Sequence, residues 1–189
     1  MGNNVGWIYD LSRCIGCHAC TVACKAENNT YPQQSPLIVK NGKAVAVNYR
    51  FVFYMESGFY PNPQRVFVSM SCNHCENPAC IKSCPVGAIT KRSKDGIVLI
   101  DDDKCIGCKY CIWACPYSAP QFNPITNKVE KCTFCVQRID TGLEPACVTT
   151  CVGRALNFVT NFDYTTSGAN APDSFSDPKY TNPSIQFLK

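Results

Sequence analysis

Short apolar segments of strand length recur along this chain, and polar or cysteine-rich segments separate them. Residues 5–10 and 65–70 combine aromatic and β-branched side chains, a composition that strands favour. Two further apolar stretches, 88–91 and 97–100, are joined by a Lys-Asp-Gly turn at 94–96. The pattern predicts several short strands with the cysteines between them.

The segment 31–65 contains no cysteine and alternates between turn-forming and strand-like parts. A proline-containing loop at 31–36 leads to a strand-like Leu-Ile-Val at 37–39, and the Asn-Gly pair at 41–42 is typical of a tight hairpin turn. An aromatic, proline-rich turn lies near 59–63. We expect a β and loop insertion here, which either covers the core or forms a docking surface for a partner.

From residue 161 the composition becomes polar, with glycine, proline and serine. A segment of this kind buries little apolar surface by itself. We therefore predict that residues 161–189 form an extended tail, which is disordered in the free chain and becomes ordered on a partner.

Cysteine is the unusual feature of an otherwise ordinary composition. The chain has 189 residues, 46% hydrophobic and 17% charged, as expected of a globular protein. Sixteen residues are cysteine, which indicates either a disulfide framework or metal ligands. Most follow one another at spacings of three to five residues, which suits ligands better than disulfide pairs. We expect no signal peptide of its own, because Met1-Gly2-Asn3-Asn4 is not basic and no apolar segment follows.

Eight central cysteines have the spacing of a two-cluster bacterial ferredoxin. The first four form Cys-x2-Cys-x4-Cys-x3-Cys-Pro at residues 72–85, and the next four form Cys-x2-Cys-x2-Cys-x3-Cys-Pro at residues 105–116. In the second kind of run, three thiolates bind one [4Fe–4S] cluster and the fourth cysteine binds the other cluster. This region therefore predicts two clusters that exchange their fourth ligands.

The other eight cysteines repeat these patterns. Residues 14–24 match residues 105–115 as Cys-Ile-Gly-Cys-x2-Cys-x2-Ala-Cys, and residues 132–151 repeat the order of 72–84 with a longer loop. The outer quartets are then left to pair with each other, with the central unit inserted between them. The predicted fold is α+β, with a terminal ferredoxin-like unit (1–30 and 116–160), the β and loop insertion (31–65), a central ferredoxin-like unit (66–115) and the extended tail (161–189).

Exchange of fourth ligands in both units uses every cysteine and predicts four [4Fe–4S] clusters. We number the corresponding cysteine quartets 1 to 4. Their members are Cys14, Cys17, Cys20 and Cys151 (quartet 1); Cys24, Cys132, Cys135 and Cys147 (quartet 2); Cys72, Cys75, Cys80 and Cys115 (quartet 3); and Cys84, Cys105, Cys108 and Cys111 (quartet 4).

Other metal centres fit the pattern less well. Zinc also binds Cys-x2-Cys pairs, but zinc sites do not require triplets closed by Cys-x3-Cys-Pro. A Rieske centre needs two histidines, whereas His18 and His74 each lie inside a complete quartet. We expect both histidines to pack around the ligands, and we expect no metal other than the iron of the clusters.

Several side chains beside the cysteines are candidates for adjusting the clusters. Lys109, Lys131 and Arg138 are expected to raise reduction potentials through charge or hydrogen bonds, with solvated surface charge as an equal alternative for Lys109. Tyr110 and Trp113 are expected to pack around a cluster and exclude water.

Charge and hydropathy exclude several classes of function. The net charge of +4 does not indicate nucleic-acid binding, because four clusters of about −2 each would make the total negative. No apolar run approaches 18 residues, so we expect no direct membrane span. The chain also lacks nucleotide-binding glycine motifs and a nucleophile beside a base, so we predict no catalytic residue. Electron transfer remains, because it requires only closely spaced cofactors.

With these motifs, residues 5–158 resemble the four-cluster iron–sulfur subunits of molybdopterin oxidoreductases, and they are most similar to those of polysulfide, thiosulfate and dimethyl sulfoxide reductases. The resemblance rests on the Cys-Ile-Gly-Cys runs at 14–17 and 105–108, on Pro-Ala-Cys at 78–80 and 145–147, and on Lys-Cys at 131–132. It implies the nested topology and the ligand sets given above.

The same resemblance implies partners. Quartet 1 would lie nearest a catalytic subunit with a molybdenum or tungsten pterin, and quartets 3 and 4 nearer a membrane quinone-reactive anchor or a second redox subunit. The complex would lie at the cytoplasmic or periplasmic face of the membrane. The chain departs from the usual pattern after Cys24 and Cys151, where Lys25 and Val152 replace proline. Alternatives are a soluble tungsten aldehyde oxidoreductase or hydrogenase complex, or a free polyferredoxin.

Overall fold

The computed structural model describes residues 4–30, 39–40, 43–44, 47–173 and 175–189. The loop expected at 31–36 and the Asn-Gly turn at 41–42 lie outside the described residues. Within the insertion, β2 (Val39–Lys40) pairs with β3 (Lys43–Ala44) as a short antiparallel ladder.

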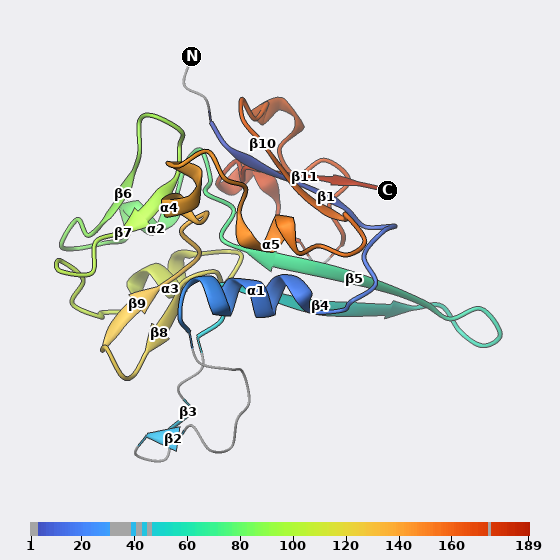
Figure 1. The fold of residues 1–189 in the computed structure, drawn as a ribbon, viewed down its shortest axis with the longest axis horizontal. Helices are drawn as coiled ribbons and strands as arrows, with labels where there is room; N and C mark the ends of the chain where they lie inside the picture. Colours follow the sequence, from blue (N-terminus) through green and yellow to red (C-terminus); the bar gives the residue numbers. More distant parts are fainter. Residues whose placement is uncertain (1–3, 31–38, 41–42, 45–46, 174) are drawn as a thin grey trace.

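A three-stranded sheet joins the two ends of the chain. Its central strand is β1 (Gly6–Asp10), which pairs antiparallel with β10 (Leu156–Val159) and parallel with β11 (Ile185–Leu188). Figure 1 shows the blue and red ends of the chain side by side in this sheet. Successive side chains of a strand point to opposite faces, so Trp7 and Tyr9 both enter the core and are each 1% exposed.

The C-terminal segment folds back onto the core, so the expectation of an extended tail at 161–189 is wrong. This part of the chain, described except for residue 174, forms the short 3₁₀ helices η1 (Tyr164–Thr166) and η2 (Pro178–Tyr180) before it ends in β11. Ile185 and Phe187 are buried in the same core as Trp7. A few well-placed apolar residues order a segment whose average composition is polar.

The longest strands form a hairpin that projects from the molecule (Figure 1). β4 (Arg50–Ser57) pairs along its whole length with β5 (Gln64–Ser71), and the strand expected at 65–70 is thereby confirmed. The base of the hairpin is buried and its tip is exposed, with Phe59 and Tyr60 almost entirely in solvent. The aromatic, proline-rich turn is therefore the tip of this hairpin.

Two smaller antiparallel hairpins lie on the opposite side of the molecule (Figure 1). β6 (Ile89–Lys91) pairs with β7 (Val98–Ile100), as the apolar stretches around the Lys-Asp-Gly turn suggest. β8 (Gln121–Asn123) pairs with β9 (Lys128–Glu130). These hairpins supply much of the apolar packing around the cysteines of quartets 3 and 4.

Within the described residues, five short α-helices each contain a cysteine or begin directly after one. They are α1 (Ala19–Glu27), α2 (Ala79–Lys82), α3 (Tyr110–Ala114), α4 (Val136–Ile139) and α5 (Ala146–Thr149). α1 packs against α5 and α2 packs against α3, so each contact joins a helix of one repeat to a helix of the other. The mixture of short helices and strands confirms the α+β class, and the division into two ferredoxin-like units stays a prediction.

Among the helices of the described residues, none has the length and apolar character that crossing a bilayer requires.

Candidate metal centre

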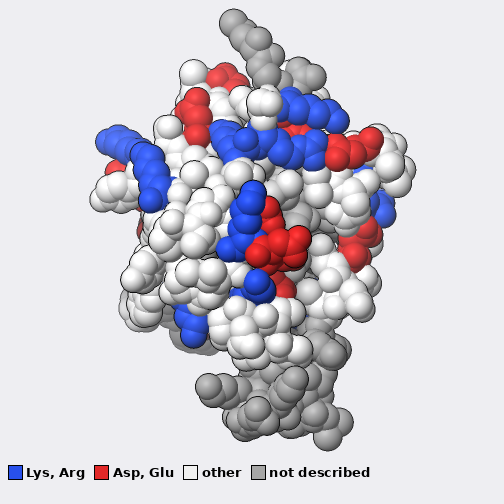
Figure 2. All heavy atoms as spheres, turned by 90° about the vertical axis from the view of Figure 1, so that its left-hand side faces the viewer, with Lys and Arg blue, Asp and Glu red and all other residues white. Residues whose placement is uncertain are grey.

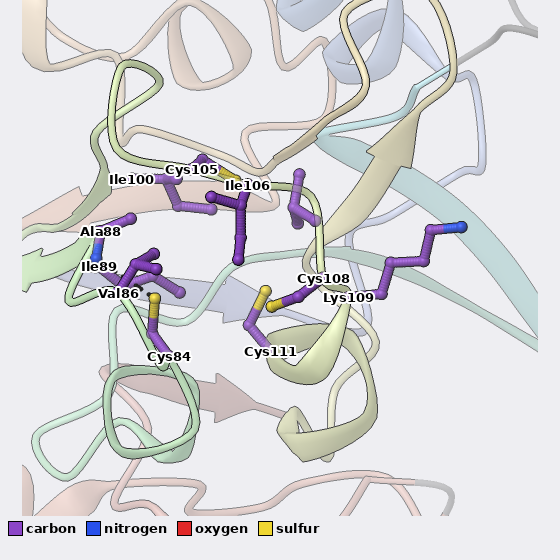
Figure 3. Close-up of a pocket in the computed structure, with 11 residues that line it drawn as sticks. Cys84, Val86, Ala88, Ile89, Ile100, Cys105, Ile106, Cys108, Lys109 and Cys111 are labelled. Atoms are coloured by element: carbon purple, nitrogen blue, oxygen red, sulfur yellow. Dashed lines mark hydrogen bonds between the residues drawn. The ribbon is translucent and has the colours of Figure 1, made fainter.

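The four cysteines of quartet 4 line one small cavity (Figure 3). Figure 3 shows Cys84 across this cavity from Cys108 and Cys111, and aliphatic side chains form most of the remaining wall. The backbone N–H of Ala88 donates a hydrogen bond to Sγ of Cys84 over 3.3 Å. The cavity is thus an apolar space with a sulfur donor from each of four chain positions.

The four cysteines of quartet 1 line a second small cavity. Cys151 comes from the other end of the chain and lies with the three cysteines of the N-terminal run. The backbone N–H of Leu156 donates a hydrogen bond to Sγ of Cys151 over 3.4 Å. The hydroxyl of Ser69 lies 3.3 Å from Sγ of Cys20. The fold therefore brings together the set that the repeat analysis assigned to one cluster.

The thiols of quartet 2 interact with one another electrostatically. Burial raises the pKa of Cys24, and the nearby Cys132, Cys147 and Cys135 raise it further. These three cysteines are the other members of the quartet, and all four are buried. The packing of α1 on α5 agrees with this, because Cys24 belongs to α1 and Cys147 to α5.

The thiols of quartet 3 also interact with one another electrostatically. The pKa of Cys75 is raised to about 12, first by burial and then by Cys72, Cys115 and Cys80. Deprotonation of one of these buried thiols is unfavourable because the neighbouring sulfurs provide no positive charge to stabilise the thiolate. Iron removes this difficulty, because a metal-bound thiol is deprotonated outright.

Electrostatic interactions also occur between cysteines of different quartets. Burial is the largest cause of the raised pKa of Cys147 in quartet 2, and Cys20 of quartet 1 raises it further. In the same way, Cys72 of quartet 3 contributes to the raised pKa of Cys132 in quartet 2. Between quartets 3 and 4, Cys111 raises the pKa of Cys80. The packing agrees with this, because Cys20, Cys72, Cys132 and Cys147 belong to one buried core cluster and Cys80, Cys105 and Cys111 to another.

Glycines in the two Cys-Ile-Gly-Cys runs explain why the sequence forms these loops. Gly16 and Gly107 have φ of +69° and +68°, a region that residues with a side chain rarely adopt. A Cβ at Gly16 would lie 2.4 Å from the ring of Phe67, and one at Gly107 would lie 2.2 Å from the carbonyl oxygen of Asn127. Both glycines therefore lie in tight turns that a side chain would obstruct.

The donor set fits iron–sulfur clusters better than disulfides or zinc. All sixteen cysteines are free. A single zinc ion draws its ligands to about 2.3 Å from one point. Among the described residues, no three His, Cys, Asp or Glu side chains converge in this way. The sulfurs surround cavities instead, which suits a cofactor with several metal atoms.

Buried polar atoms without a protein partner support the same fit. Among the described residues, most such atoms belong to residues that directly precede or follow a cysteine in the sequence. They include the Thr21 hydroxyl, the Asn73 amide, Nε2 of His74 and the Thr133 hydroxyl. A buried donor without an acceptor is costly, and the sulfide of a cluster would supply acceptors at these places.

The two histidines behave differently from each other. His74 is buried, accepts a hydrogen bond from the Val98 N–H at Nδ1 over 3.0 Å, and packs edge-on against Phe134. The packing role expected of it is confirmed. His18 is exposed, and φ of +60° places it in the left-handed turn that begins α1.

The basic candidates occupy three distinct environments. Lys131 is buried and donates to the carbonyl oxygens of Val98 and Cys132, so it is a fixed positive charge beside the ligands. The ammonium of Lys109 lies 3.9 Å from the ring centre of Phe122, and Figure 3 shows it pointing away from the quartet 4 cavity. Arg138 forms an ion pair with Glu27.

Tyr110 and Trp113 do not pack around a cluster in the single chain, contrary to expectation. The Trp113 side chain is 86% exposed and that of Tyr110 is 58% exposed. Both residues belong to α3, whose buried face carries Cys111. The aromatic side chains are on the solvent face of the helix that supports quartet 4.

Sequence reasoning missed Arg50, which is buried among the sulfurs. Burial lowers the pKa of its guanidinium, but Cys147, Cys132, Cys20 and Cys24 outweigh burial and raise the pKa overall. The residue lies far from any cysteine in the sequence, at the start of β4. Only the pairing of β4 with β5, and the packing of that hairpin on α1, bring it to quartets 1 and 2.

Surface charges are mixed on the face that Figure 2 shows, where basic and acidic side chains lie beside one another. Ion pairs such as Arg92 with Asp140, at 2.7 Å, and Lys104 with Asp101, at 3.2 Å, occur across the described residues. This face carries no continuous basic field of the kind that binds a phosphate backbone.

Residues 63–161 match the family model of the 4Fe-4S dicluster domain, which is just over half of the chain. The matched segment contains twelve of the sixteen cysteines, and the other four form the run at 14–24. The fold and the cysteine cavities thus define an iron–sulfur protein, and this protein belongs to the 4Fe-4S dicluster family.

Curated relatives extend the similarity to most of the chain. It is 42% identical to one subunit of the sulfite dehydrogenase of Allochromatium vinosum over 160 residues, 80% of this chain and 66% of that protein. It is 40% identical to one component of the anaerobic dimethyl sulfoxide reductase of Escherichia coli over 166 residues, 84% of this chain and 74% of that protein. One subunit of the tetrathionate reductase of Salmonella typhimurium is 46% identical over 148 residues, which cover 78% of this chain and 54% of that protein. The similarity thus spans between about half and three quarters of the length of these relatives.

Proposed function

We propose that this chain is an electron-transfer subunit with four [4Fe–4S] clusters. It carries single electrons between a catalytic subunit that holds a molybdenum or tungsten pterin and a membrane quinone-reactive or other redox subunit. Each bound cluster accepts one electron and passes it on, so that a two-electron reaction in a partner uses two successive passages. The ligands are quartets 1 to 4 as defined above.

The observation that carries this proposal is that neighbouring quartets share buried clusters. Quartets 1, 2 and 3 meet in one core cluster, which contains Cys20, Cys72, Cys132 and Cys147, and quartets 3 and 4 meet in a second, which contains Cys80, Cys105 and Cys111. Electron transfer over several short steps requires such a series. A store of independent clusters does not require it.

The exposure of the cysteines supports quartet 1 as one end of the series. Cys17 of quartet 1 is exposed, whereas all four cysteines of quartet 2 are buried. The cysteines that link quartets 2 and 3, Cys132 and Cys72, are buried. We assign quartet 1 and quartet 4 as the two places where electrons enter and leave.

We also propose the nested division of the chain into a terminal and a central ferredoxin-like unit. The packing of α1 on α5 supports the first, because it joins residues from the two ends of the chain. The packing of α2 on α3 supports the second. Each contact brings together two helices whose cysteines belong to quartets with exchanged fourth ligands.

The partners follow from the relatives, several of which are named as one component of a reductase or dehydrogenase with more than one subunit. A chain that supplies clusters without a substrate site requires a catalytic partner. The exposed aromatic side chains of Tyr110 and Trp113, beside quartet 4, give the second partner an apolar surface.

The test is elemental analysis of the native complex, purified without oxygen from its own host through a tag on this chain. We expect about one molybdenum or tungsten atom for every four or five clusters. Tungsten would favour the aldehyde oxidoreductase alternative over the reductase. Nickel would assign the chain to a hydrogenase complex, and iron as the only metal would indicate a free polyferredoxin and refute the partner assignment.

A further inference from the structure

Arg50 is a buried cation without an acidic partner among the described residues. Its side chain is 2% exposed. One terminal nitrogen donates to the Ser69 hydroxyl over 3.1 Å and the other to the Ser71 hydroxyl over 2.8 Å, while Nε has no protein acceptor. The guanidinium lies 4.5 Å from the centre of the Trp7 ring. The serines and the ring hold the group in place but do not neutralise it.

The guanidinium interacts with ligand sulfurs of two quartets. Burial raises the pKa of Cys147 and Cys132 in quartet 2, and the positive charge of Arg50 opposes this increase. On the side of quartet 1, Arg50 reaches Cys20 through the hydroxyl of Ser69, whose oxygen lies 3.3 Å from Sγ of Cys20. Arg50 therefore has a relayed contact with a ligand of quartet 1 and an electrostatic interaction with ligands of quartet 2.

The charge balance explains why a cation is placed here. A buried charge is strongly destabilising unless an opposite charge and hydrogen bonds compensate it. Neutral thiols provide little compensation, whereas thiolates that bind a cluster provide negative charge on both sides of the guanidinium. The site is electrostatically complete only when quartets 1 and 2 are loaded.

We propose that Arg50 is a positioning residue that raises the reduction potentials of the clusters bound by quartets 1 and 2. This inference rests on the proposed function, because it assumes clusters at both quartets. Reduction adds one electron to a cluster, and a fixed cation in a medium of low dielectric favours the more negative state. Hydrogen bonds to the ligand sulfurs act in the same direction.

The experiment is a redox titration of the anaerobically reconstituted full chain, followed by electron paramagnetic resonance. Arg50→Gln removes the charge, Arg50→Lys keeps it, and Ser69→Ala breaks only the relay to Cys20. The matched control is Arg65→Gln, which removes a positive charge from the same hairpin at an exposed ion pair with Glu56.

In Arg50→Gln, we expect two of the four transitions to move to lower potential. At the wild-type midpoint, the ratio of reduced to oxidised cluster should fall about tenfold for the more affected transition, which is 59 mV for one electron. Arg50→Lys should restore most of this shift. Ser69→Ala should lower one transition only, and Arg65→Gln should leave all four in place. The paired shift and its rescue by lysine distinguish an electrostatic effect from a merely structural one.

Iron and sulfide counts separate failure of this inference from failure of the proposed function. A wild-type chain with fewer than four clusters refutes the proposed function. Four clusters with unchanged potentials in Arg50→Gln, or with an equal shift in Arg65→Gln, refute the role of Arg50 alone. If Arg50→Gln does not assemble, Ser69→Ala decides the matter, and an unshifted set of transitions in that variant overturns the inference.

Discussion

Replacement of Phe187 by alanine tests whether the C-terminal segment is part of the folded core. The side chain is completely buried, lies edge-on to Tyr9 with ring centres 6.1 Å apart, and packs against Phe175 at 5.2 Å. Truncating a buried phenylalanine to alanine costs about 3–5 kcal/mol. Each 1.4 kcal/mol is a tenfold change in an equilibrium, so opening of β11 should become roughly 100- to 4,000-fold more frequent.

Amide hydrogen exchange of the C-terminal peptide measures this opening directly and needs no global unfolding transition. Leu188→Ala is the matched control, because the neighbouring side chain is 38% exposed and its removal should change exchange by less than about threefold. Fast exchange in the wild type, or equal effects of Phe187→Ala and Leu188→Ala, would refute the packing of β11 against β1 in the free chain.

Three further predictions concern the cysteine sites. Gly107→Ala should reduce the iron bound per chain, because the new Cβ meets a backbone oxygen. Gly142→Ala is the control and should not reduce it, because Gly142 also has a positive φ but nothing lies within 4 Å of the new Cβ. Equal losses of iron would contradict the steric argument. Cys108→Ala should lose roughly four of about 16 iron atoms and spare the resonances of quartets 1 and 2, and a uniform loss would show that the units are not separable. Trp113→Ala should leave iron content unchanged and alter the unfolding free energy by less than about 0.5 kcal/mol, since the ring is 86% exposed; rapid loss of iron would show that it shields a cluster.

The strands around the cysteines could be predicted from the sequence because their signals are local. The strand at 65–70 and the tight turns at Gly16 and Gly107 depend on residues within a few positions of one another. The approach of Cys151 to the N-terminal cysteines was equally accessible, because an internal repeat carries long-range information. Cys151 lies with Cys14 in one cavity although 136 residues separate them.

The C-terminal segment and Arg50 could not be predicted, because their environments are created by tertiary contacts. Phe187 is one of few apolar residues in a polar segment, and its burial depends on a parallel pairing with β1 that no local pattern encodes. Arg50 has the sequence context of an ordinary strand residue. It is buried because Trp7 and Ser69 approach it from separate strands.

The central claim is that each of the four quartets binds a [4Fe–4S] cluster, and the most direct test is to count iron and acid-labile sulfide per chain. Sixteen free cysteines in four quartets predict about 16 of each in anaerobically reconstituted protein. A count of about eight would show that only two quartets bind clusters, and it would contradict the four-step series on which the proposed function depends.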